Sequence, residues 1–434
     1  MKTWQTLLDG SDANHVWRVI HDIAEAMRPE AENLDPNADP GFGGGTAGLA
    51  TFYAYLGAET NDAQWTNLAN RLIEHSIDAL SERPLRPDLY EGFTGIAWTI
   101  DHLQPLLGED EEIEVDDDDA DDDSDPIGEA LVQVLDREQP FPRGTFDLIG
   151  GLAGYGVYAY HALPRPAARR SLELLVQRIL EIGEPVGENG FSWFTPPEEM
   201  PDWQIEEAPN GKYNLGISHG IAAVISVLGM CAGAGVMNDE QLATYDRAVD
   251  WLLAQKQNGK TWCFANSVIE GVPFHRDRLA WCYGDPGIAG ALFTAARHTG
   301  NARWEAEALD IARTAARRPM DDSRVMDAGL CHGAAGLAHL FNRYYQASDD
   351  PVLADAARAW MRYTVDMQKP GVGIAGYEFW VPPDWVAFSG WLAGLCGVGL
   401  GLLGGVSSIE PAWDQFLAVS VPLEKRSLAR SATS

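Results

Sequence analysis

Two cysteines and a histidine lie directly before two glycine motifs in the second half of the sequence. Cys282 precedes Tyr-Gly-Asp-Pro-Gly, and Cys331 with His332 precedes Gly-Ala-Ala-Gly. Two thiolates and an imidazole suit Zn²⁺, and three protein ligands leave a fourth coordination position open, as in catalytic zinc sites. The spacing is not that of a zinc finger. The alternative interpretation is therefore two buried cysteines and a core histidine.

A second group of polar side chains occupies related positions. His219 precedes Gly220 as His332 precedes its own glycine, and a histidine that binds no metal can act as a general acid or base. Asp147, ahead of Gly151, could orient that histidine. Arg278 and Tyr283 flank Cys282 and complete the set, and Arg278 could pair with Asp147. The alternatives are helix caps for His219 and Asp147, and a surface ion pair for Arg278.

The other cysteines and two further histidines have no convergent partner. We interpret them as structural: Cys231, Cys263, Cys396, His275 and His339. Five cysteines, odd in number and widely spaced along a long chain, do not form a disulfide framework.

The candidate site residues lie next to the motifs of an internal repeat. A Gly-x-x-Gly motif followed by an apolar run occurs seven times, starting at residues 45, 92, 151, 220, 284, 333 and 394. In the fourth copy Ala223 replaces the second glycine, which we expect to cost little beyond a tighter helix contact. Apolar residues at helical spacing predict amphipathic helices between the motifs, over 62–80, 167–182, 239–255, 302–317 and 351–367. Asn238 and Asp350 are expected to cap two of them.

Each repeat predicts one polar-faced outer helix and one almost uncharged inner helix. An open solenoid needs distinct capping repeats, whereas both ends of this chain carry the same glycine motif. We therefore expect a single all-α domain over residues 1–434, an α/α toroid with seven inner and seven outer helices. The inner helices would start at one face, and this arrangement would bring Cys282, Cys331 and His332 to one rim.

Three segments interrupt the repeat. Residues 183–213 form an irregular insertion rich in proline, glycine and aromatic residues, and residues 372–388 have a similar composition. Long ordered loops are usually functional, so we expect both to pack over the mouth of the site. The acidic run 109–125 lacks apolar residues and predicts a solvated, mobile loop.

The charge of the chain excludes several classes of partner. Its 64 acidic and 31 basic residues give a formal net charge of −33. Such a chain is not a sequence-independent nucleic-acid binder, and direct docking on anionic membranes is equally disfavoured. The uncharged stretch 386–409 contains seven glycines and repeats the pattern of the other motifs, so we do not expect it to span a membrane. The N-terminus lacks the apolar core of a signal peptide, and the expected location is the cytoplasm.

The donor set indicates one kind of chemistry. Zinc with neutral ligands generates hydroxide for hydrolysis, but two thiolates donate charge and weaken that Lewis acidity. They suit the binding of an incoming thiol, whose pKa falls so that it becomes a nucleophile. We therefore expect addition of a thiolate to an electrophile, with His219 handling the proton.

The ordered motifs Ser-His-Gly (218–220), Trp-Cys-Tyr-Gly-x-Pro-Gly (281–287) and Cys-His-Gly (331–333) resemble those of the lanthionine synthetase C family, over residues 41–405. The resemblance implies an α/α toroid with zinc on Cys282, Cys331 and His332. It implies a ribosomal precursor peptide, dehydrated at Ser and Thr, as the substrate. A peptide cysteine would add to dehydroalanine or dehydrobutyrine and form a lanthionine or methyllanthionine ring.

The resemblance also assigns roles within the site. It places the catalytic histidine on His219, its acid on Asp147, and the residues flanking the first zinc cysteine on Arg278 and Tyr283. His219 would protonate the enolate left by addition or help to deprotonate the thiol, and both remain open. No dehydratase module precedes the repeat, so the chain resembles the stand-alone cyclases and a separate dehydratase is an expected partner.

Three other functions remain open at this stage. The same zinc chemistry could add glutathione or another free thiol to dehydroamino acids, although 25 arginines against 6 lysines favour a bacterial peptide cyclase. A toroid glycoside hydrolase could use Asp147 and Asp285 as paired carboxylates, but this leaves the two cysteines and His332 unexplained. The third is a non-catalytic scaffold with structural zinc or none.

Overall fold

The structure is a computed structural model that describes residues 2–108, 125–276 and 278–424 of the chain. Within these residues, an inner helix begins directly after the first glycine of each of the seven motifs. That glycine is the N-cap residue in every case, and almost every side chain of these helices is buried, because they lack a polar face. The inner helices are α2 (Thr46–Thr60), α4 (Phe93–Leu107), α6 (Leu152–His161), α9 (Ile221–Gly233), α11 (Asp285–Thr299), α13 (Ala334–Ser348) and α15 (Leu395–Val406).

The outer layer consists of amphipathic helices that bury one stripe against the inner layer. The five expected segments are helical, and Asn238 and Asp350 cap two of them through their side chains, the first in a capping box with Gln241. Two outer helices complete the layer without having been assigned a range from the sequence, α1 (Gly10–Glu32) and α5 (Pro126–Leu135). The others are α3 (Ala63–Glu82), α7 (Pro166–Ile182), α10 (Asp239–Ala254), α12 (Ala302–Ala316) and α14 (Pro351–Asp366).

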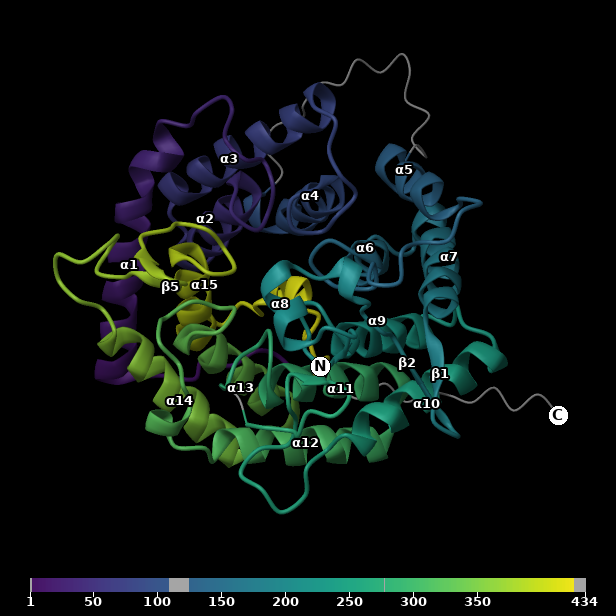
Figure 1. The fold of residues 1–434 in the computed structure, drawn as a ribbon. Helices are drawn as coiled ribbons and strands as arrows, with labels where there is room; N and C mark the ends of the chain where they lie inside the picture. Colours follow the sequence, from purple (N-terminus) through teal and green to yellow (C-terminus); the bar gives the residue numbers. More distant parts are fainter. Residues whose placement is uncertain (1, 109–124, 277, 425–434) are drawn as a thin grey trace, which may run out of the picture.

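The two layers close into a ring, so the predicted α/α toroid is confirmed (Figure 1). The last inner helix, α15, packs against α1 and against the first inner helix, α2. At this seam the Cys396 thiol donates to the Gly48 carbonyl at 3.2 Å. None of the described helices combines the length and apolar character needed to cross a bilayer.

Backbone hydrogen bonds join the loops that precede the inner helices. Each bond runs from the loop of one repeat to the loop of a neighbouring repeat, and bonds of 2.8–3.2 Å link six of the seven neighbouring pairs among the described residues. They pair positions 42 with 90, 148 with 218, 217 with 282, 282 with 331, 331 with 392, and 391 with 43. Cys282 and Cys331 are therefore held by main-chain bonds to each other and to both neighbouring repeats.

The second glycine of the motif is required by close packing. In six of the seven motifs a Cβ at this position would overlap the carbonyl oxygen six residues earlier, as Gly336 would meet Leu330. In the fourth motif Ala223 carries a methyl group at this position. The expectation that this costs little beyond a tighter helix contact stays a prediction.

The middle of the ring is filled rather than open. The 3-10 helix η3 (Ala412–Leu417) crosses it, seen in yellow at the centre of Figure 1. Phe416 packs against Phe42, Trp98 and Trp391, and its carbonyl accepts a 2.7 Å bond from the Tyr90 hydroxyl. This aromatic cluster forms a floor below the face at which the inner helices begin.

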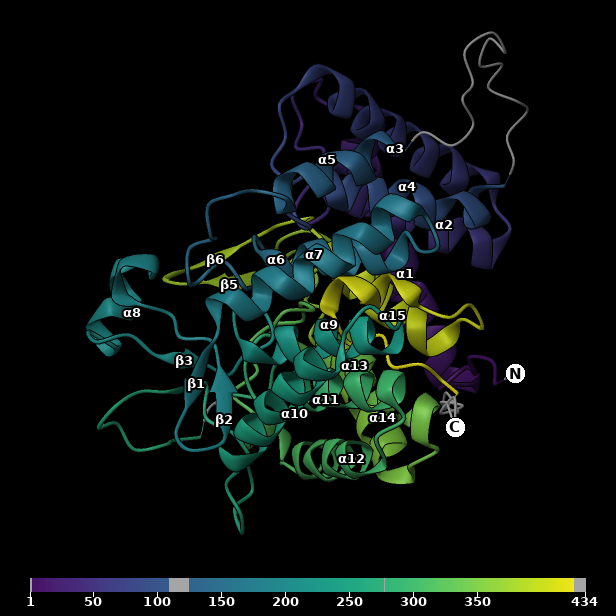
Figure 2. The same ribbon diagram turned by 90° about the vertical axis from the view of Figure 1, so that its right-hand side faces the viewer.

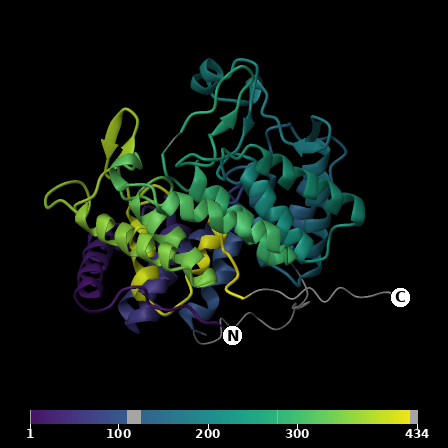
Figure 3. The same cartoon turned by 90° about the horizontal axis from the view of Figure 1, so that it is seen from below.

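Three small two-stranded sheets and a short helix project from that face. Figures 2 and 3 show them on one side of the ring, away from both termini. The insertion predicted at 183–213 contains β1 (Glu184–Val186), β2 (Gly190–Ser192), η1 (Pro197–Glu199), α8 (Asp202–Glu207) and the start of β3 (Tyr213–Asn214), which pairs with β4 (Ser267–Val268). The second aromatic segment forms β5 (Phe379–Val381) and β6 (Asp384–Val386), with Trp380 opposite Trp385. Another 3-10 turn, η2 (Met320–Asp322), leads toward the sixth motif.

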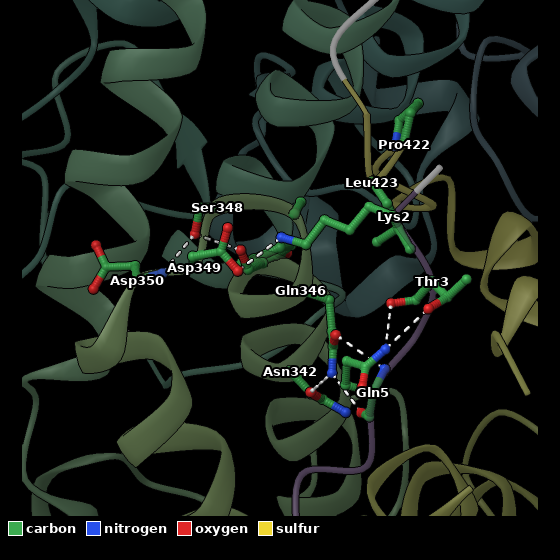
Figure 4. Close-up of polar contacts among 12 residues, drawn as sticks. Lys2, Thr3, Gln5, Asn342, Gln346, Ser348, Asp349, Asp350, Pro422 and Leu423 are labelled. Carbon is green, nitrogen blue, oxygen red and sulfur yellow. Dashed lines mark hydrogen bonds and ion pairs between the residues drawn. The ribbon is translucent and has the colours of Figure 1, made fainter. Parts of the chain in front are cut away.

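The N-terminal residues fasten the opposite face. Lys2 forms a 2.8 Å ion pair with Asp349, and Gln5 exchanges backbone hydrogen bonds with the side chain of Gln346 at the end of α13 (Figure 4). The acidic run predicted at 109–125 lies outside the described residues except for Asp125, whose side chain caps α5 by accepting from the Gly128 N–H.

Candidate metal centre and active site

Cys282, Cys331 and His332 converge at the mouth of the ring. Their ligand atoms all lie within 4.8 Å of one another, and among the described residues no fourth histidine, cysteine or carboxylate joins the group. Cys282 ends the turn that leads into α11, and the other two residues end the turn that leads into α13. The backbone bond from the Cys282 N–H to the Cys331 carbonyl, 3.1 Å long, fixes the two turns relative to each other.

The donor set fits a metal ion. The Nδ1 atom of His332 is buried and has no hydrogen-bond partner among the described residues, an arrangement that is costly unless a ligand satisfies it. The hydrogen bond from the Cys331 thiol, with help from His332 and Arg278, lowers the pKa of Cys282 well below its ordinary value. Two sulfurs and one imidazole nitrogen in this arrangement suit Zn²⁺ and leave room for a further ligand.

Asp327 supports this centre and was missed by the sequence analysis. Its Oδ2 lies 3.6 Å from His332 Nε2 and accepts a hydrogen bond from the Trp380 N–H at 3.1 Å, while its Oδ1 accepts from the Gly329 N–H at 2.9 Å. A carboxylate behind a metal-binding histidine orients the ring and makes it a better donor. The sequence offered one signal, because Asp39 and Asn214 lie at the same distance before their glycines and make the same local turn.

His219 and Asp147 form a hydrogen-bonded pair from neighbouring repeats. Asp147 Oδ2 lies 2.7 Å from His219 Nδ1, and Asp147 Oδ1 accepts from the Gly150 N–H at 3.0 Å. The side chain of His219 is 49% exposed, so its Nε2 edge faces the mouth rather than the core. With Nδ1 held by a carboxylate, Nε2 is the atom that can exchange a proton with a bound molecule.

Arg278 and Tyr283 lie beside the thiols. Arg278 Nη2 is 3.8 Å from Cys282 Sγ, and Asp147 bonds to His219. The Tyr283 hydroxyl accepts from the Asn214 amide at 3.1 Å. Burial, with the neighbouring Cys282 adding to it, raises the pKa of Tyr283 to about 12, so this group remains a neutral phenol at physiological pH.

Other titratable residues noted from the sequence lie elsewhere. Asp285 is 2% exposed and accepts backbone hydrogen bonds from Cys263 and Phe264, so the paired carboxylates needed for a glycoside hydrolase do not meet at the mouth. His339 is bonded to Asp414 in the interior. Cys231, Cys263 and Cys396 are buried free thiols, and His275 lies exposed in a loop.

These features, a closed α/α ring with two thiols, an imidazole and a histidine–aspartate pair at its mouth, are accompanied by a match over most of the chain to a known family. Residues 38–418 match the family described as lanthionine synthetase C-like protein, and the chain belongs to that family. The nisin biosynthesis protein NisC of Lactococcus lactis subsp. lactis is 24% identical over 339 residues, which cover 75% of this chain and 78% of that protein. The solved structure of a nisin cyclase superposes with a TM-score of 0.71 at 19% identity, over 95% of this chain and 98% of the other.

Proposed function

We propose that this chain is a zinc-dependent lanthipeptide cyclase, which joins peptide cysteines to dehydroalanine or dehydrobutyrine in thioether rings. The observation that carries the proposal is the open Cys282–Cys331–His332 cluster beside the His219–Asp147 pair. Membership of the lanthionine synthetase C-like family and similarity to a nisin biosynthesis protein support it. Zinc held by the three residues would supply a site at which an incoming thiol loses its proton.

The other side chains at the mouth have separate roles in the reaction. Addition of the peptide sulfur to the β-carbon of a dehydroamino acid leaves an enolate, and His219 Nε2 gives a proton to its α-carbon. Asp147 fixes the orientation of the His219 ring through Nδ1. Arg278 contributes positive charge next to the sulfurs, and the neutral Tyr283 phenol can donate a hydrogen bond to the substrate carbonyl.

The proposal includes the setting in which the reaction takes place. The substrate would be a precursor peptide that a separate dehydratase has already treated, because addition needs a dehydroamino acid and this site has no means of making one. Five free thiols suit the reducing cytoplasm. We also propose that residues 1–434 act as one catalytic domain, because the site takes residues from four consecutive repeats.

The test is ring formation by the purified, metal-loaded protein. The substrate is a synthetic peptide with one dehydroalanine and one cysteine, and the products are treated with N-ethylmaleimide before mass spectrometry. A cyclised peptide has no free thiol and escapes alkylation, and an enzymatic product contains a single lanthionine diastereomer. The proposal would be refuted if the protein bound no zinc. It would also be refuted if the peptide thiol disappeared no faster with the protein than without it. Transfer of glutathione without cyclisation would favour the free-thiol alternative.

A further inference from the structure

A groove lies beside the β5–β6 hairpin, and Asp327 is one of the residues that line it. It encloses about 590 Å³, a volume typical of a ligand site, and it lies between this hairpin, the end of α14 and the loop before the sixth motif. Its lining is mainly apolar and aromatic, with Met326, Tyr363, Tyr377 and Trp385 as its large side chains. The reaction at the mouth does not use these four side chains.

Asp327 connects the groove with the centre. Asp327 lines the groove, lies 3.6 Å from His332 Nε2 and accepts the Trp380 N–H of the hairpin. One side chain of the groove therefore contacts the ring of a proposed metal ligand, which places the groove next to the ligand cluster.

Exposed apolar side chains gather on this face of the ring. Of the six large apolar residues that are clearly exposed in the described part of the chain, only Ile77 lies on an outer helix. The other five belong to the hairpin or to the loops that lead into the inner helices, namely Val272, Met326, Val381, Trp385 and Phe388. Met326 and Trp385 are 51% and 46% exposed. Such clustering on a protein with so many charges marks an interaction surface.

The charge of the groove indicates the kind of partner. Its lining includes the carboxylates of Asp327, Asp366 and Glu378 against the single ammonium group of Lys369. The whole chain has a formal charge of −33, so its long-range field also attracts cations and repels acidic segments. An occupant with basic and apolar side chains satisfies both properties of the groove.

We propose that this groove binds an extended, cationic and apolar segment of the peptide substrate, and so holds the peptide while its cysteines and dehydroamino acids reach the mouth. This inference rests on the proposed cyclase function and adds the class of peptide. Met326 and Trp385 provide apolar contacts, and Asp366 and Glu378 pair with lysine or arginine side chains. The groove residues position the substrate and take no part in the chemistry.

The experiment selects peptides with the metal-loaded, full-length protein. A phage-displayed library of random peptides about 12 residues long, about 40 Å when extended, is enriched on the protein, and the recovered peptides are then measured by fluorescence anisotropy. We expect sequences with several lysines or arginines among apolar residues, and weaker binding at high salt. The inference would be overturned if the enriched peptides were acidic or uncharged, or if no peptide were enriched.

Groove variants locate the binding. Met326→Glu and Trp385→Ala should each weaken the selected peptides by about tenfold or more, as at other interface anchors. The double variant Asp366→Asn/Glu378→Gln, which cannot disturb an apolar core, should weaken lysine-rich peptides and remove most of their salt dependence. Ile77→Glu is the matched control, because it adds the same charge at a similarly exposed apolar site on an outer helix, and it should leave binding unchanged. Equal losses in Ile77→Glu, or none in the groove variants, would overturn the assignment.

A second readout separates this inference from the cyclase proposal. Each variant is also given a short peptide with one cysteine and one dehydroalanine, too short to reach the groove. Ile77→Glu should cyclise it at the rate of the unmodified protein, and the groove variants should lose less rate on it than on a peptide long enough to fill the groove. If the unmodified protein forms the thioether and the groove variants bind the selected peptides as well as it does, only the groove is rejected. If the unmodified protein forms no thioether, the cyclase function is rejected.

Discussion

The histidines inside the ring and those at its mouth differ in burial and in hydrogen bonding. At the far ends of the inner helices, His102 stacks on Trp98 at 4.1 Å and bonds to Tyr55, and burial lowers its pKa to about 3. His339 is fully buried against Asp414. At the mouth, His219 is half exposed and His332 keeps a buried nitrogen without a partner. His102 and His339, on inner helices, therefore complete the core, whereas His219 and His332, in the loops, lie at the mouth.

The largest effect is expected from removing a sulfur at the mouth. Cys282→Ala should abolish zinc binding, and ring formation should fall by at least about 10³-fold, because metal catalysis contributes several kcal/mol. Metal analysis and the alkylation assay measure the two losses. Cys263→Ala, which removes a buried thiol outside the cluster, should keep its zinc and lose about 1 kcal/mol of stability. Zinc retained at full stoichiometry in Cys282→Ala would refute the ligand assignment.

A pair of histidine variants tests the contrast directly. His219→Ala should reduce ring formation by about 10²–10⁴-fold or produce mixed stereochemistry, while zinc content and melting temperature stay constant. His339→Ala should instead lower the free energy of unfolding by about 1–3 kcal/mol, because Asp414 loses a buried partner. Chiral analysis of the product and thermal melts distinguish them. Full cyclisation by His219→Ala would remove the assigned role.

Asp327→Asn should have an intermediate effect. The amide oxygen of asparagine can still accept from the Gly329 N–H, but its NH2 group cannot accept from the Trp380 N–H. The charge that strengthens His332 as a donor is also lost, so zinc affinity should fall by about 10–100-fold. Competition with a chelator measures the change, and excess zinc should restore activity. Asp39→Asn, in the equivalent position of the first motif, is the matched control and should bind zinc normally. An unchanged affinity in Asp327→Asn would show that the carboxylate serves only the loop.

The smallest effect concerns acid stability at the far face. The pKa of His102 falls from 6.5 to about 3 on folding, mainly through burial, so the unfolded chain binds the proton more strongly. The stabilisation is complete above about pH 6.5 and is lost as the pH falls toward 3, at up to about 1.4 kcal/mol per pH unit. His102→Gln should flatten this part of the unfolding curve, followed by urea titrations between pH 7 and 4. If the free energy of unfolding changed with pH by the same amount in both proteins, His102 would not be the cause of the acid sensitivity.

The sequence predicted the ring because the repeat is explicit. The first glycine of each motif caps an inner helix, and the helical spacing of apolar residues located the outer helices except α1 and α5. The meeting of Cys282 with Cys331 and His332 followed from the same register, since adjacent repeats present equivalent positions at one rim. Their roles, and those of His219, Asp147, Arg278 and Tyr283, stay predictions.

What could not be predicted depends on side chains that meet across repeats. Asp327 lies at the same distance before its glycine as Asp39 and Asn214, so its local turn could have been predicted. Its approach to His332 and its contact with the Trp380 backbone depend on how the hairpin folds over the loop. The aromatic floor around Phe416 comes from a segment outside the repeat. The sequence offered Asp285 as one of two catalytic carboxylates, but in the structure it is buried and bonded to the backbone of the loop at Cys263. Such contacts arise from tertiary packing and have no periodic signature.

The contact between the two ends of the described chain has a topological consequence. The Lys2 N–H donates to the Glu424 carboxylate at 2.7 Å, so a short linker could join the ends across this seam. New termini could then be opened in the loop between α9 and α10, and the order of repeats along the gene would change without altering which helices are neighbours. A circularly permuted chain of this kind should retain the same mouth, because a closed ring has no first repeat.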